Sequence, residues 1–133
     1  MARARVYAAT LLVFLAVDAV WLFFVGGPLY SAAIGPLLAD QFRTLPAFLF
    51  YLLHVTGILV LVLPLARQRS GVRAAFLYGA MFGLCTYGTY DLTNHAVLKI
   101  WGWQLTLIDM AWGAFVTGLA ASAGTWVEQR TVN

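Results

Sequence analysis

The chain has 133 residues, of which 62% are hydrophobic and only 10% are charged. A soluble domain carries roughly 25% charged residues because its surface must be wet, so this composition excludes an ordinary water-soluble domain and predicts contact with lipid. The formal net charge is +3, and the single cysteine, Cys85, excludes an internal disulfide, a cysteine-based zinc site and a Cys-x-x-Cys redox motif.

Long apolar stretches define the predicted architecture. A membrane-spanning helix needs about 20 predominantly apolar residues, and four stretches in chain order meet this requirement, at residues 6–27, 46–66, 74–97 and 105–127. We therefore predict a single transmembrane domain over residues 1–133. Its predicted fold is an all-α, integral membrane bundle of four transmembrane helices. The third and fourth stretches carry more polar residues and more glycine than the second.

The first stretch has some features of a cleavable signal peptide, because Arg3 and Arg5 precede it. The apolar core of such a signal is usually about 7–15 residues long. This stretch is longer and contains Asp18, which is unusual in a signal core. We therefore expect a retained helix.

The connection between the first two stretches, residues 28–45, is long for so small a protein. Its sequence is semi-apolar, PLYSAAIGPLLADQF, and is interrupted by Pro36. Two interpretations stay open. The segment is a short interfacial helix or a cap over the mouth of the bundle, or it is an ordinary loop.

Basic residues predict the orientation, because cytoplasmic loops are enriched in Lys and Arg. Six of them fall on one side of a four-span arrangement, and only Arg43 and Lys99 fall on the other. We expect both termini in the cytoplasm (N-in/C-in) and a multi-pass protein of the bacterial inner membrane. Because the basic residues mark topology, no nucleic acid is expected as a partner.

Ionisable side chains inside the spans are the most informative residues, because a charge in the bilayer interior costs several kcal/mol. They are Asp18, His54, Asp91 and Asp109, with His95 near the end of the third span. From a helical rise of about 1.5 Å, the first four lie about 6–13 Å from the outer ends of their spans. Agreement in depth between four spans predicts one shared site in the outer half of the bilayer.

Helical spacing adds aromatic and amide groups to this site. On the third span Tyr87, Asp91 and Asn94 share one face. An Asp-x-x-Trp motif in the first and fourth spans places an indole beside a carboxyl group. The predicted residues for binding a ligand or a proton are Asp18, Trp21, His54, Tyr87, Tyr90, Asp91, Asn94, Asp109 and Trp112. No catalytic residue and no metal site is assigned.

The charge of this predicted site needs compensation. It holds three carboxyl groups, at most two imidazoles and no Lys or Arg. Three buried anions cannot coexist unpaired, so at least one aspartate is expected to be protonated, or a cation occupies the site. The alternative is structural, since polar side chains also join helices through hydrogen bonds worth about 0.6–2 kcal/mol each.

Several motifs occur together and in order: DAVW at residues 18–21, TYDLTN at 89–94 and DMAWG at 109–113. The outer segment PLYSAAIGPLLA and the second-span sequence FLFYLLHVTG accompany them. In this combination the chain resembles, over nearly its whole length, the bacterial family of predicted membrane proteins known as domain of unknown function 2177. The resemblance implies a four-helix membrane protein and brings no established activity. Its matching positions fall in the polar cluster.

Three functions stay open. The first is binding or transport of a proton, a cation or an amine-bearing ligand, by a homodimer because four spans are few for a transporter. The second is a lipid-acting enzyme that uses Asp91, Asp109 and His54 in acid–base catalysis. The chain lacks a Gly-x-Ser-x-Gly elbow and a nucleotide-binding loop. The third is an accessory or structural subunit of a larger membrane complex.

The sequence favours binding over catalysis. No cofactor is predicted, with haem ligation by His54 and His95 as the one alternative. The lipid bilayer is the expected partner in every case.

Overall fold

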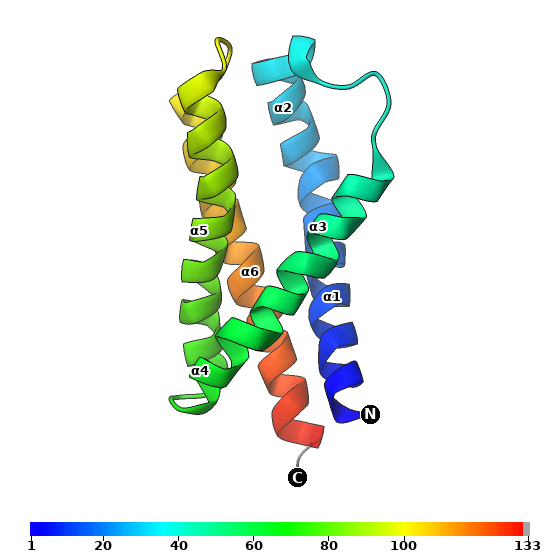
Figure 1. Ribbon diagram of the computed structural model, residues 1–133, viewed down its shortest axis with the longest axis vertical. Helices are drawn as coiled ribbons and strands as arrows, with labels where there is room; N and C mark the ends of the chain where they lie inside the picture. The colour runs from blue at the N-terminus through cyan, green and yellow to red at the C-terminus, as the bar shows by residue number, and fades with distance from the viewer. Residues whose placement is uncertain (132–133) are drawn as a thin grey trace.

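The computed structural model describes residues 1–131, and the regular elements in this range are helices. They are α1 (Ala2–Trp21), η1 (Leu22–Gly26), α2 (Gly27–Ile34), η2 (Gly35–Leu37), α3 (Thr44–Gly57), η3 (Ile58–Val62), α4 (Leu63–Arg67), α5 (Val72–Val97) and α6 (Trp103–Thr131). Consecutive elements join end to end, so that α1 to η2 form one rod and α3 to α4 form a second. With α5 and α6 the element order gives four rods in the described chain, and Figure 1 shows their arrangement.

Length and composition suit a bilayer. Of the helical segments in the described range, three are long and apolar enough to cross a membrane: Ala2–Leu37, Thr44–Arg67 and Trp103–Thr131. These correspond to the first, second and fourth predicted spans. The rod α5 has 26 residues, which is enough length for a span. Its second half lowers its hydropathy through Thr86, Thr89, Asp91, Thr93 and Asn94.

The first rod is longer than the sequence predicts. The expected end at residue 27 is wrong, because the helix continues through α2 to Ile34 and ends in the short turn η2. Residues 28–37 are therefore neither a separate interfacial helix nor a loop, and residues 38–43 alone form the non-helical connection. Pro28 does not end the helix, because proline is tolerated in the first turn of a helical segment and Pro28 lies in the first turn of α2.

Each proline that follows a π-helical turn is accommodated by that turn. In η1 the N–H group of Gly27 bonds to the carbonyl of Leu22, five residues earlier, just before Pro28. The turn η3 repeats this arrangement just before Pro64. Proline has no N–H group, and its ring collides with the carbonyl four residues earlier in a regular α-helix. A π-helical turn absorbs one extra residue and relieves the collision, so both rods continue past their prolines.

The rods α5 and α6 pack against each other along their length and run antiparallel (Figure 1). Small residues permit this close approach, because glycine lets two helix backbones come together. Gly83 lies against the backbone of Gly113, and the ring of Tyr87 covers Gly113 from α5. The rod α1 packs on the other side of α6, while α3 crosses in front of them diagonally.

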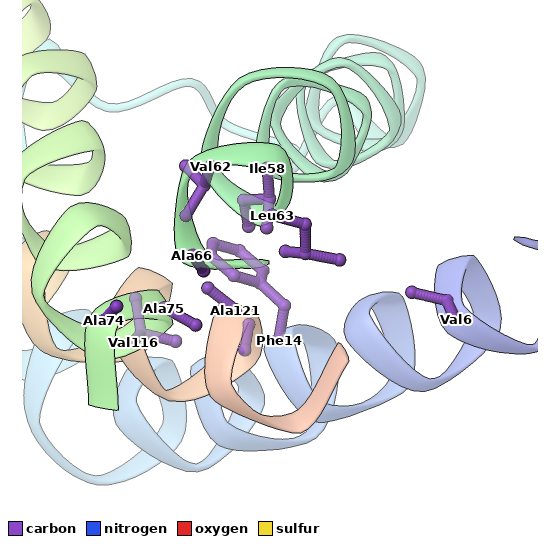
Figure 2. Packing of buried hydrophobic residues seen from close by; sticks show 11 residues of the cluster. Val6, Phe14, Ile58, Val62, Leu63, Ala66, Ala74, Ala75, Val116 and Ala121 are labelled. Carbon is purple, nitrogen blue, oxygen red and sulfur yellow. The ribbon is translucent and has the colours of Figure 1, made fainter. Parts of the chain in front are cut away.

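The apolar core lies in the half of the bundle that contains the start of α1 and the end of α6 (Figure 2). Phe14 is fully buried there, together with Ile58, Leu63 and Val116. Every rod contributes to this cluster. Some residues of the predicted polar site border this cluster, since Tyr87 and Trp112 pack against it and the ring of His54 lies 5.1 Å from that of Phe14.

Gly113→Ala should destabilise the protein, because an added methyl group would overlap the ring of Tyr87. Overpacking of this kind costs about 1–3 kcal/mol. Gly102→Ala is the matched control, since nothing lies within 4 Å of the methyl group that it adds. Thermal unfolding in detergent, followed by circular dichroism, should show a lower midpoint for Gly113→Ala alone. Equal midpoints for the two variants would contradict the close packing of α5 on α6.

Candidate functional site

A cavity of about 400 Å³ lies between the four rods, in the half of the bundle away from the start of α1. Its acidic lining residues are Asp18 and Asp109. Its aromatic lining residues are Trp21, Tyr30, Phe42, Phe50, Tyr51, Tyr87, Tyr90 and Trp112. Leu22, Ala47 and Thr86 complete the wall. The described lining therefore contains two carboxyl groups and eight aromatic rings, and no Lys, Arg or His.

A larger hollow of about 880 Å³ lies at the opposite end of the bundle, between α1 and the rod that ends in α4. It is walled mainly by apolar side chains such as Leu59 and Leu63, with Arg3 and Arg67 at its edge. Arg67 forms an ion pair there with Glu128. No residue of the predicted polar site lines this hollow, so the smaller cavity is the candidate site.

Asp18 ties three rods together. Its carboxylate accepts hydrogen bonds from the Tyr51 hydroxyl of α3 at 2.7 Å and from the Trp112 indole N–H of α6 at 3.0 Å. Asp18 is 6% exposed as a residue, so both donors act where water is scarce. Hydrogen bonds to charged groups are worth about 1.5–3 kcal/mol each, and this pair fixes one wall of the cavity.

The two Asp-x-x-Trp motifs interlock across the bundle. Trp112, from the second motif, donates to Asp18 of the first rather than to its own Asp109. The rings of Trp21 and Trp112 stack with centroids 4.5 Å apart and an angle of 5° between their planes. The donor role of the fourth-span indole is therefore directed at the aspartate of the other motif, while Asp109 accepts from Tyr30. The two copies of the motif contact each other within one chain, although α1 and α6 run in opposite directions.

Asp109 accepts a hydrogen bond from the hydroxyl of Tyr30, which belongs to α2. Sequence analysis missed Tyr30 because it placed this residue beyond the end of the first helix. The extra residue absorbed by η1 brings Tyr30 back to the face that carries Asp18. The signal available in the sequence was Gly27-Pro28, which is compatible with a π-helical turn and not only with a helix end.

Asp91 lies behind the cavity wall and does not line the cavity. It is fully buried, and neither of its carboxylate oxygens receives a hydrogen bond from a donor within residues 1–131. The carboxyl group of Asp109 on α6 is its acidic neighbour. The two acids therefore form a buried pair, of which one member, Asp109, faces the cavity.

The histidines lie apart from each other. His54 packs between Phe50 and Phe82, with both ring centroids 5.2 Å away, and its Nε2 is 2.9 Å from the Thr117 hydroxyl. The Nδ1 of His95 is 3.0 Å from the Thr106 hydroxyl, eleven positions from Thr117 on α6. At about 1.5 Å per residue this separation is about 16 Å. The geometry does not bring His54 and His95 to one shared ligand.

Six of the nine predicted site residues line one cavity: Asp18, Trp21, Tyr87, Tyr90, Asp109 and Trp112. Asp91 and His54 lie one layer behind it, and Asn94 is half-buried elsewhere on α5. Besides Tyr30, sequence analysis omitted Tyr51 and the phenylalanines of the lining. Tyr51 lies one helical turn from His54, which is the signal that could have found it. An isolated phenylalanine in an apolar helix gives no such signal.

The fold and this site define a helical membrane protein with several candidate spans and a polar cluster within its bundle. A family described as "Predicted membrane protein (DUF2177)" matches residues 4–126, and the chain belongs to this family. The comparison with curated proteins found no match, and neither did the comparison with solved structures.

Tyr51→Phe should lower the free energy of unfolding by about 1.5–3 kcal/mol, because it removes a donor from the buried carboxylate of Asp18. Tyr78→Phe is the control, since the Tyr78 hydroxyl makes no hydrogen bond to another residue in the described chain, although its ring packs against the core. Reversible unfolding in mixed detergent micelles measures both. An effect of the same size in the two variants would show that the Asp18 contact contributes no stability.

Proposed function

We propose that this protein binds an organic cation within the membrane, in the cavity lined by Asp18 and Asp109. The observation that carries the proposal is the composition of the cavity lining. Among the described residues, this lining combines two carboxyl groups with eight aromatic side chains and includes no Lys, Arg or His. Cation binding of this kind is compatible with transport, and the ligand class is an amine or a quaternary ammonium ion.

The chemistry of the wall favours a cation that carries apolar groups. The face of an aromatic ring is electronegative and attracts a cation by about 0.5–2 kcal/mol. The carboxyl groups provide the opposite charge, and both already accept hydrogen bonds from Tyr51, Trp112 or Tyr30. The remaining wall is largely ring carbon, which suits alkyl groups better than the water shell of a metal ion. The volume of about 400 Å³ falls within the usual range for small-molecule sites.

A four-span topology with both termini in the cytoplasm belongs to the same proposal. The rod α5 is as long as a span and lies antiparallel to α6. The basic residues Arg69 and Arg73 flank its first turn, at the end of the bundle where α1 begins. Cytoplasmic enrichment of such residues supports this orientation, with the cavity in the outer half of a bacterial inner membrane.

A structural role of the polar cluster is the second candidate. The observation that favours it is the Asp18 carboxylate, because its bonds to Tyr51 and Trp112 already join three rods. In that case the protein is an accessory subunit, and the cavity has no ligand. Binding measurements separate the two candidates, since only the first requires a saturable site.

The purified protein should bind one or more members of a series of quaternary ammonium ions, from tetramethylammonium to tetrabutylammonium. Isothermal titration calorimetry in lipid nanodiscs provides the affinity. Asp18→Asn should weaken binding about tenfold, which corresponds to about 1.4 kcal/mol, because it removes one of the two charges in the lining. Asp40→Asn makes the same change at an exposed residue outside the cavity and should bind as the wild type does.

Absence of saturable binding for every ion of the series would refute the proposed function and leave the structural candidate. Equal weakening by Asp18→Asn and Asp40→Asn would also refute it, because the attraction would then come from the overall charge of the surface rather than from the cavity.

Two single-cysteine variants test the topology directly. With Cys85→Ser as background, Ser70→Cys and Gly102→Cys place thiols in the turns before and after α5. A membrane-impermeant thiol reagent applied to intact cells should label residue 102 and should label residue 70 only after permeabilisation. Labelling of both positions from the same side would show that α5 does not cross the membrane.

A further inference from the structure

We propose that Asp91 and Asp109 together hold one proton behind the cavity wall and release it when an organic cation binds. This inference rests on the proposed function and specifies how the site is regulated: the cation and the proton compete for the same buried negative charge. Asp91 is a positioning residue in this scheme, because it acts on the ligand only through Asp109.

The register of α5 and α6 places the two acids opposite each other. On α5, Tyr87 packs over Gly113 of α6, and His95 bonds to Thr106 of α6. Asp91 lies midway between Tyr87 and His95, so its partner on the antiparallel helix lies between Gly113 and Thr106. Asp109 occupies that stretch, so the register makes the two carboxyl groups neighbours across the contact between α5 and α6.

The hydrogen bonds around the pair are incomplete without a proton. Asp91 is fully buried, and its two oxygens have no donor in residues 1–131. A buried acceptor without a donor costs about 1–3 kcal/mol, and two adjacent carboxylates also repel each other. One proton resolves both problems, because a protonated carboxyl group donates its O–H to the neighbouring carboxylate. The pair then carries one negative charge instead of two.

The groups that face the pair offer no other compensation. Tyr30 approaches from α2, Tyr87 and Tyr90 lie on α5, and Asp18 contributes a further negative charge from α1. On α3, Tyr51 bonds to Asp18, and His54 bonds to Thr117. His95 bonds to Thr106 near the end of α5. Tyrosine side chains are neutral near pH 7, so no residue among these provides a fixed positive charge to the two acids.

Cation binding and proton release are coupled through Asp109, which belongs to both the cavity lining and the acid pair. A cation beside Asp109 stabilises the doubly ionised pair, so the O–H bond of the protonated carboxyl group breaks and the proton passes to water. One positive charge enters and one leaves, and the net charge buried in the bundle stays the same. Apparent affinity for the cation must then rise with pH, by up to about tenfold per pH unit for one proton.

The test measures proton release and affinity together in nanodiscs. A titration of the wild type with tetraethylammonium in weakly buffered solution, followed with a pH indicator, should release up to one proton per bound cation. Asp91→Asn should still bind tetraethylammonium but without proton release and without the pH dependence, because the asparagine amide donates to Asp109 permanently. Asp40→Asn should behave as the wild type does, since Asp40 is exposed and outside the cavity.

A second measurement needs no ligand. Infrared spectra of the wild type near neutral pH should contain the C=O band of a protonated carboxyl group in an apolar environment, and Asp91→Asn should lack it. If the wild type shows the band but binds no quaternary ammonium ion, the proposed function fails and the proton site stands. If the wild type binds the ion but releases no proton at any pH, or lacks the band, the inference is overturned and the proposed function stands.

Discussion

The arrangement of the helices depends on the hydrogen bonds that the buried carboxylate of Asp18 accepts within a bundle that faces lipid. Water is absent from the bilayer core, so each polar group there needs a partner from the protein. Asp18 obtains its partners from Tyr51 and Trp112, on two different rods. Because these donors must converge on one carboxylate, the rods cannot slide or rotate freely. The same constraint keeps the aromatic rings of the cavity at fixed positions around the acids.

The division of the bundle into an apolar half and a polar half follows from the sequence. Phe14 and Asp18 are separated by one helical turn, yet the first lies in the apolar core and the second lines the cavity. The three aspartates within the predicted spans lie in the half away from the start of α1, as their depths along the spans indicate. Three of the predicted spans coincide with helices that are long and apolar enough to cross a membrane, and membership of the family is confirmed over residues 4–126.

Other features were beyond sequence reasoning for identifiable reasons. Proline usually marks a helix end, so the continuation of the first helix past Pro28 required knowledge of the π-helical turn before it. That error hid Tyr30, the partner of Asp109. The hydrogen bond from Trp112 of the second Asp-x-x-Trp motif to Asp18 of the first depends on how far two antiparallel helices are offset. Spacing within one helix gives no information about that offset, and so the sequence did not identify Asp18 as the acceptor for Trp112.

The central claim is that the space between Asp18, Asp109 and the stacked tryptophans is a binding site for an organic cation. An experimental structure in nanodiscs with tetraethylammonium tests it most directly. Density for the ion should lie inside the cavity, in contact with the ring faces and beside a carboxyl group of the lining. A map in which side chains fill this space, or in which the ion lies only on the surface of the bundle, would contradict the account.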